Sequence, residues 1–154
     1  MARWLMVAEA MSFVGLGQVP MARRGDRRPD NTGFPANPLT SDMLRYARIV
    51  DTIRANDELY IGSPSFRWLG AAMRAMLATR RDGFPGEIKI PLLMIAAARD
   101  TIVSTPTIEQ MGLRLRTGRH MVVPGARHEL FMENDTIRGQ VFAAFDAFIT
   151  EQSS

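Results

Sequence analysis

The chain has 154 residues, 46% of them hydrophobic, with a formal net charge of +3 and no cysteine. This composition is typical of one globular domain, and the lack of cysteine excludes disulfides and thiolate metal sites. The two histidines, His120 and His128, do not have the spacing of a helical metal site, so we expect neither a metal nor another cofactor.

Residues 1–19 are mostly apolar, with Arg3 near the start, and so have to be compared with a targeting segment. Glu9 interrupts the run, whereas a signal peptide needs about 7–15 apolar residues and a membrane span needs about 20. We therefore expect an amphipathic helix over 4–16 in a soluble protein. A cytoplasmic location follows by default, and peripheral contact with a membrane is left open.

Two further helices are predicted in the first half of the chain. Residues 41–56 and 64–81 carry apolar side chains at three- and four-residue spacing, which is typical of a helix with one buried face. Residues 20–40 are rich in proline, glycine and arginine, so we expect a basic linker before the second helix.

Short polar residues indicate where these two helices begin. Thr40 or Ser41 is expected to cap the helix over 41–56, because a side-chain oxygen can accept from the free amides of a first turn. Ser63 is expected to cap the next helix, with Pro64 at its first position and Gly83 after its end.

The last part of the chain has a different pattern. Residues 91–98 form a continuous apolar run opened by Pro91, which is typical of a parallel strand buried on both faces. A helix over 105–117, a strand over 119–123 and a helix over 134–151 are predicted to follow. This order predicts a right-handed strand-helix-strand unit with one additional packing helix.

Polar side chains follow both predicted strands at the points where the strands end. Asp100 comes directly after the first strand, and His128 lies in the loop after the second. The carboxyl ends of neighbouring parallel strands lie at one edge of a sheet, so these two side chains can meet. A carboxylate that accepts from Nδ1 fixes the imidazole tautomer needed in a general base. The alternative is a surface aspartate and an unrelated loop histidine.

Several stretches of the chain resemble one family. Asn37–Asp42, Arg45–Arg48 and Leu59–Leu69 resemble the helical cap of the lysophospholipase L2 and monoacylglycerol-lipase group of α/β-hydrolases. Pro124–Leu130, together with Met132 and Glu133, resembles its histidine loop. In this fold the chain order of the catalytic residues is serine, acid, histidine. The resemblance therefore implies Asp100 as the triad acid, His128 as the triad base, and a lipid ester or lysophospholipid as substrate.

The same resemblance implies the fold class and the organisation of the chain. The fold class is α/β, and the chain is expected to be the C-terminal half of an α/β-hydrolase fold. A helical cap is expected over 1–86, including the basic linker 20–40. A strand-helix-strand-helix segment that carries the acid and the histidine is expected over 87–154.

One part of the family pattern is missing. These enzymes place the nucleophile on a Gly-x-Ser-x-Gly turn upstream of the cap, and no serine of the chain has that context: Ser12, Ser41, Ser63, Ser65, Ser104, Ser153 and Ser154. The first five strands and the oxyanion loop are also expected upstream of residue 1. We therefore expect a fragment that is inactive alone, either a truncated gene product or a piece of a longer or split enzyme. Without the serine no acyl-enzyme forms.

Two other functional classes remain as alternatives, and a protein partner is also expected. The amphipathic N-terminal segments and the arginine-rich linker favour a non-catalytic module that binds an anionic lipid surface or a partner. Nucleic-acid binding is the weakest alternative, because the arginines are dispersed among acidic residues. The missing N-terminal half, or a second copy of the chain, is expected as the protein partner.

Overall fold

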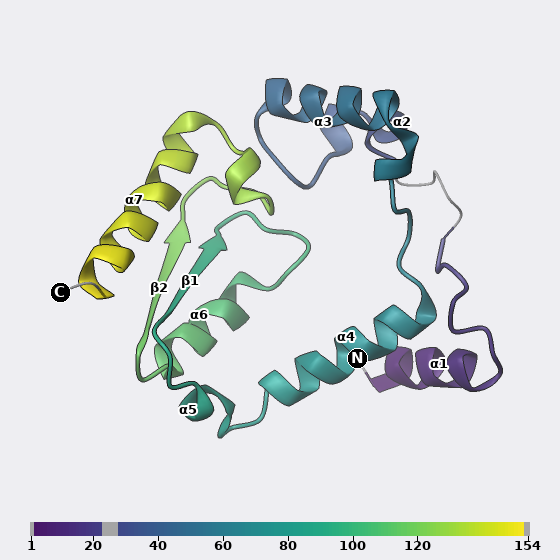
Figure 1. Ribbon diagram of the computed structural model, residues 1–154, viewed down its shortest axis with the longest axis horizontal. Coiled ribbons are helices and arrows are strands. Elements are labelled where there is room, and N and C mark those ends of the chain that lie inside the picture. The colour runs from purple at the N-terminus through teal and green to yellow at the C-terminus, as the bar shows by residue number, and fades with distance from the viewer. Residues whose placement is uncertain (1, 23–27, 153–154) are drawn as a thin grey trace. The chain divides into compact units, whose positions relative to one another are not determined.

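The structure, a computed structural model, describes residues 2–22 and 28–152. It divides into two compact units, a helical unit formed by residues 1–33 and 52–84 and a sheet unit formed by residues 34–51 and 85–154 (Figure 1). Residues 23–27 of the predicted basic linker lie outside the described part of the chain.

The helical unit is built on two helices that pack together. Helix α1 (Ala2–Phe13) lies along helix α4 (Phe66–Thr79), as Figure 1 shows. Small residues allow the approach, since Ala8 is fully buried and a Cβ placed on Gly70 would lie 3.5 Å from the Ala8 methyl. Both helices were predicted from the spacing of their apolar residues.

Short helical turns interrupt the segment that was predicted as a linker. Helix α2 (Pro29–Thr32) begins with a proline, and the 3₁₀ turn η1 (Phe34–Ala36) follows it. Within the sheet unit the Phe34 ring packs edge-on against Tyr46, with 5.6 Å between the ring centroids. A further 3₁₀ turn, η2 (Asp57–Leu59), lies in the helical unit.

Both predicted N-caps are displaced along the chain. Helix α3 (Met43–Ala55) is capped by Asp42, whose Oδ1 accepts from the Arg45 amide at 3.0 Å. The prediction of Thr40 or Ser41 was wrong because the hydroxyls of both residues donate to a distant loop.

Helix α4 is likewise capped two residues later than predicted. The Ser65 hydroxyl, rather than that of Ser63, accepts from the Trp68 amide at 3.3 Å. The helix therefore starts after Pro64, and Arg80 takes the position that follows its last residue. Pro64 itself accepts through its carbonyl from the Met21 amide, which holds it in an extended pairing outside the helix.

The sheet unit has the predicted order of strand, helix, strand and helix. Strand β1 (Leu92–Ala97) pairs in parallel with strand β2 (Gly118–Val123), after the short helix α5 (Phe84–Glu87). Helix α6 (Thr105–Arg114) connects the strands, and helix α7 (Asp135–Gln152) follows them, after the 3₁₀ turn η3 (Leu130–Met132). None of the helices in the described residues is both long and apolar enough to cross a bilayer.

One face of the two-stranded sheet packs against α7. Side chains alternate between the faces of a strand, and paired residues of parallel strands point to the same face. The buried core on this side joins the ends of both strands, the loop after β2 and the first turns of α7: Ala97, Val123, Ala126, Ile137 and Val141.

The opposite face packs against α6. A Cβ placed on Gly112 of α6 would lie 2.5 Å from Cβ and 2.6 Å from Cγ of His120, which is in β2. Glycine at this position therefore permits the helix to approach the strand. His120 thus contributes to packing between α6 and β2.

Two glycine substitutions test this packing. Gly112→Ala should lower the free energy of unfolding by about 1–3 kcal/mol, because the new methyl collides with a Cβ that cannot rotate away. Gly139→Ala in α7, where nothing lies within 4 Å of the new Cβ, should raise it by about 0.5–1 kcal/mol through helix propensity. Urea unfolding followed by circular dichroism measures both. Equal effects of the two substitutions would contradict the close approach of α6.

The sheet itself predicts self-association. Among the described residues β1 pairs only with β2, and two parallel strands are a poor independent sheet. Its other edge can pair with a second chain. Light scattering of the purified chain should therefore give a molar mass above the 17.2 kDa of one copy. A monodisperse monomer with a cooperative, high-temperature melt would contradict this expectation.

Candidate active site

The in-register pairing of the strands brings two loops together. Ala97 and Val123 are register partners at the ends of β1 and β2. The pairing continues beyond the strands, because the Ala98 amide donates to the Val123 carbonyl at 3.1 Å and the Arg99 amide donates to the Ala126 carbonyl at 2.9 Å. The two loops therefore leave the sheet side by side.

Asp100 and His128 meet between these loops, as predicted. Nδ1 of His128 lies 2.8 Å from Oδ2 of Asp100. The Asp100 side chain is only 4% exposed, whereas that of His128 is 27% exposed. The pair therefore joins a buried carboxylate to an imidazole that still reaches solvent.

The surroundings of Asp100 keep it ionised. Its Oδ1 accepts from the amides of Ile102 at 2.7 Å and Val103 at 3.0 Å. Burial by itself raises the pKa of this carboxyl, but the hydrogen bonds from Val103, His128 and Ile102, together with the charge of His128, outweigh burial and lower the pKa below 3.8. The carboxylate then accepts from Nδ1–H, which leaves Nε2 of His128 as the basic nitrogen.

The backbone on both sides of the pair is fixed locally. The Thr105 hydroxyl, at the start of α6, donates to the Ala97 carbonyl at 2.7 Å and so holds the loop that carries Asp100. Gly125 has a φ of +76°, in the left-handed region that favours glycine, and turns the chain from β2 into the histidine loop.

The segment Asn37–Asp42 packs against the histidine loop, which spans residues 124–133. The Glu129 amide donates to the Leu39 carbonyl at 2.8 Å, and the Arg127 guanidinium donates to the Asn37 carbonyl at 2.8 Å. From the sequence this segment was expected in the cap by family resemblance, with Thr40 or Ser41 as a helix cap. Its contact with the histidine loop, which Glu133 completes, was not predicted.

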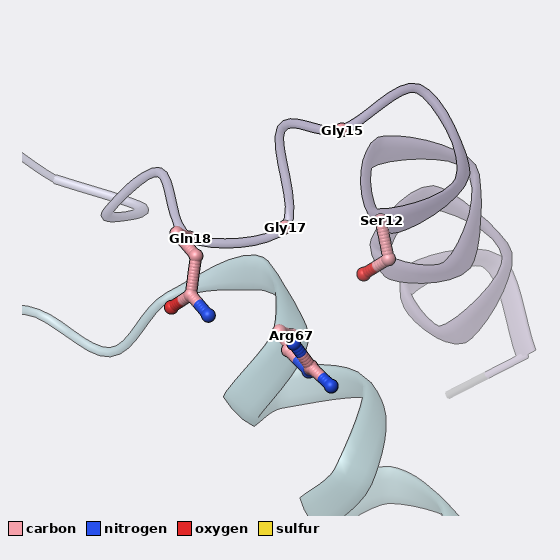
Figure 2. A pocket seen from close by; sticks show the side chains of 5 residues that line it. All are labelled: Ser12, Gly15, Gly17, Gln18 and Arg67. Carbon is pink, nitrogen blue, oxygen red and sulfur yellow. The ribbon is translucent and has the colours of Figure 1, made fainter.

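Each of the two units has a pocket. A pocket of about 540 Å³ in the sheet unit is bordered by Pro35, Ala36, Asn37, Pro38, Arg99, Asp100, Thr101 and Arg127. A pocket of about 380 Å³ in the helical unit is bordered by Ser12, Gly15, Gly17, Gln18 and Arg67 (Figure 2). No cluster of three or more histidine, aspartate or glutamate side chains in the described residues can hold a metal ion.

Four of the serines in the described residues have hydrogen-bond partners away from His128. The Ser12 hydroxyl donates to the Ala8 carbonyl at 2.8 Å, and the Ser41 hydroxyl donates to Glu133. Ser65 and Ser104 accept from helix amides as N-caps. Within the described part of the chain no serine hydroxyl makes a hydrogen bond to His128.

Comparison with known proteins places the chain in a family. A family model described as serine aminopeptidase, S33, matches residues 7–135. A probable lysophospholipase L2 from Haemophilus influenzae is 25% identical over 148 residues, which are 96% of this chain and 46% of that protein. Lysophospholipase L2 from Escherichia coli K12 is 25% identical over 129 residues, covering 79% of this chain and 37% of that protein.

A solved structure has a similar fold. A soluble variant of monoglyceride lipase from Saccharomyces cerevisiae, in complex with a substrate analogue, superposes with a TM-score of 0.66 at 20% identity. The match covers 96% of this chain and 48% of the lipase. The chain thus spans somewhat under half the length of the relatives that it matches.

The low pKa of Asp100 predicts how stability depends on pH. A folded-state pKa below the unfolded value contributes stability that is complete above the unfolded pKa of 3.8 and is lost as pH falls through the folded pKa. Asp100→Asn removes this titration and can still accept from Ile102 and Val103. Between about pH 6 and about pH 3, the free energy of unfolding should therefore fall less in Asp100→Asn than in the wild type, as measured by urea unfolding. The same loss in both proteins would contradict this.

Proposed function

This chain belongs to the serine aminopeptidase S33 family of α/β-hydrolases, and we propose that Asp100 and His128 are the acid and the general base of its catalytic triad. The observation that carries the proposal is the 2.8 Å contact between Asp100 Oδ2 and His128 Nδ1 on neighbouring loops. The proposed reaction is hydrolysis of a carboxylic ester of a lipid.

In the proposed reaction His128 transfers one proton in each of two steps, acylation and deacylation. Nε2 takes the proton of a serine hydroxyl as the serine oxygen attacks the ester carbonyl, and Asp100 stabilises the imidazolium that forms. The imidazolium then donates that proton to the departing alcohol, which leaves an acyl-serine. A water attacks the acyl group, gives its proton to Nε2, and the proton returns to the serine oxygen as the fatty acid leaves. Atoms and charges balance over the cycle.

A lipid with a single acyl chain is the proposed substrate. The relatives are a lysophospholipase L2 and a probable lysophospholipase L2, and the similar structure is a monoglyceride lipase. A lysophospholipid and a monoacylglycerol share a glycerol ester of one fatty acid. The shared chemistry is therefore the ester, whereas the head group is what would differ between the two substrates.

We propose that the serine and the oxyanion donors come from polypeptide outside these 154 residues. The supporting observation is that no serine here lies on a Gly-x-Ser-x-Gly turn. Residues 1–86 are proposed to act as the helical cap over the site, and residues 87–154 to carry the acid and the histidine. On this proposal the chain alone is inactive.

If the nucleophile lies outside this chain, as proposed, the chain alone should have no esterase activity. The 154-residue chain should not hydrolyse lysophospholipid or short-chain nitrophenyl esters, and a fluorophosphonate serine probe should not label it. When an N-terminal half with a Gly-x-Ser-x-Gly turn is fused to it or co-expressed with it, activity should appear. Stoichiometric labelling of the chain alone, lost on substitution of one of its own serines, would refute this assignment.

Substitutions in the reconstituted enzyme distinguish the proposed role of His128 from that of His120. His128→Ala should abolish turnover, and Asp100→Asn should lower kcat by about 10⁴-fold through the wrong imidazole tautomer. His120→Gln is the matched control, because His120 packs against α6 and should leave kcat near that of the unsubstituted enzyme. Equal losses for the two histidine variants would contradict the role of His128.

A further inference from the structure

Glu133 is a carboxylate without exposure, at the end of the histidine loop. Its relative exposure is 0%, and it is the largest fully buried side chain in the described residues. Burial of a carboxylate is costly unless hydrogen bonds replace its water. The contacts of Glu133 therefore have to compensate for the lost hydration.

Those contacts join two segments that are far apart in sequence. The Ser41 amide lies 3.1 Å from each carboxylate oxygen, and the Ser41 hydroxyl donates to Oε2. From the other side, the Arg127 amide donates to Oε1 at 2.7 Å. Glu133 thus ties the residue before His128 to the segment that precedes α3.

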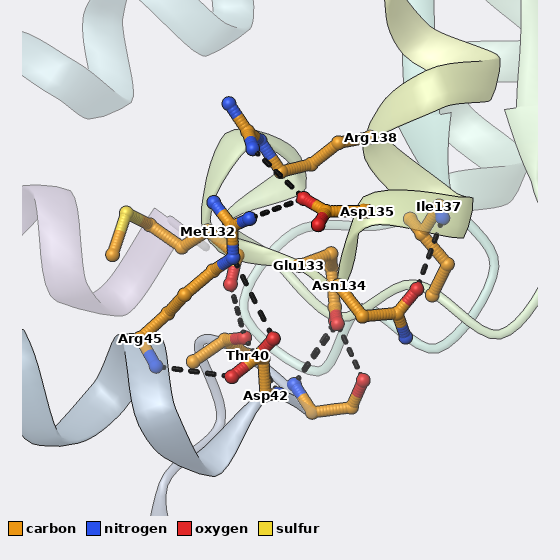
Figure 3. Close-up of polar contacts among 10 residues, drawn as sticks. Thr40, Asp42, Arg45, Met132, Glu133, Asn134, Asp135, Ile137 and Arg138 are labelled. Carbon is orange, nitrogen blue, oxygen red and sulfur yellow. Dashed lines mark hydrogen bonds and ion pairs between the residues drawn. The ribbon is translucent and has the colours of Figure 1, made fainter.

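Further hydrogen bonds strengthen the same junction. The Thr40 hydroxyl donates to the Met132 carbonyl at 2.6 Å, and the Arg127 guanidinium donates to the Thr40 carbonyl at 3.1 Å. Figure 3 shows Thr40 and Asp42 facing the stretch from Met132 to Asn134. The bond from the Glu129 amide to Leu39 fixes the residue after His128.

We propose that Glu133 is a positioning residue, which holds the backbone at His128 so that its imidazole stays aligned with Asp100. This rests on the proposed function in so far as it takes His128 to be the base. His128 is more exposed than Asp100, and in the described part of the chain its ring is hydrogen-bonded to that carboxylate. The backbone amides on both sides of His128 are held, that of Arg127 by Glu133 and that of Glu129 by the Leu39 carbonyl. The backbone position from which the imidazole extends is therefore fixed. A displacement of about 1 Å in a catalytic group can lower the rate by about 10²-fold.

The neighbouring Asp135 is a matched control. Its side chain is 88% exposed and pairs with Arg45 at 2.5 Å and with Arg138 at 3.2 Å (Figure 3). It therefore links the same two segments of the chain, but it makes no hydrogen bond to the backbone beside His128 in the described structure. Loss of Asp135 changes the charge of this junction but leaves the hydrogen bonds of Glu133 in place.

The proposal is tested by the tautomer of His128 in the full 154-residue chain. Magic-angle-spinning NMR of protein labelled with ¹⁵N in its two histidines tolerates self-association and distinguishes a protonated Nδ1 from a bare one. In the wild type the Nδ1–H form of His128 should dominate. Glu133→Ala should cause loss of that dominance, Glu133→Gln should give an intermediate population, and Asp135→Asn should resemble the wild type. The His120 signal should stay unchanged throughout and so report that the sheet unit is folded.

In the reconstituted enzyme Glu133→Ala should lower kcat by about 10²-fold with little change in KM, and Glu133→Gln should restore part of the loss. An unchanged His128 tautomer in Glu133→Ala with an intact His120 signal would overturn the proposal. If Glu133→Ala loses the His120 signal and is unfolded, the Gln variant decides, and a wild-type tautomer in that variant overturns the proposal. The tautomer needs no turnover. A response of His128 in a reconstituted enzyme without activity would therefore support the positioning role and refute the proposed function.

Discussion

The parallel pairing of β1 with β2 is the interaction on which the candidate site depends. Six register partners, from Leu92 with Gly118 to Ala97 with Val123, end both strands at the same level. Two further backbone bonds carry the alignment into the loops. A shift of the register by one residue would turn every side chain of one strand to the opposite face, so the same register that buries Val123 also places Asp100 beside His128.

The sheet alone does not fix the histidine. The loop after β2 contributes Ala126 to the apolar core, and it is also held by polar contacts with the segment before α3. Burial of Glu133 and Thr40 at that junction excludes water from the hydrogen bonds, which makes them stronger than exposed ones. Asp100 is held by amides of its own loop, whereas the backbone beside His128 is held by a distant segment, so the two side chains are positioned by independent contacts.

The sequence was sufficient for features that depend on local pattern. The long helices follow from apolar periodicity and the first strand from a continuous apolar run. The contact between Asp100 and His128 follows from the rule that neighbouring parallel strands end at one edge. The family resemblance gave the fold class, which the comparisons confirm. Membership of a hydrolase family also favours an enzyme over a lipid-surface module.

Features that depend on long-range contacts could not be read from the sequence. Thr40 and Ser41 have the residue types of a helix N-cap, but their hydroxyls bind Met132 and Glu133, which lie 92 positions away. Glu133 was noted only as part of the resemblance to the family's histidine loop, and its neighbours Asn134 and Asp135 do not indicate that it is buried. Only the fold shows that it is buried and that it reaches Arg127.

The account is tested most directly by a crystal structure of the complete enzyme, with its serine in place. The account predicts that Nε2 of His128 lies about 2.6–3.2 Å from the nucleophilic oxygen, or somewhat farther without substrate, while Nδ1 keeps its contact with Asp100. A structure in which a different histidine faces that serine, or in which Nε2 of His128 points away from it, would contradict the central claim.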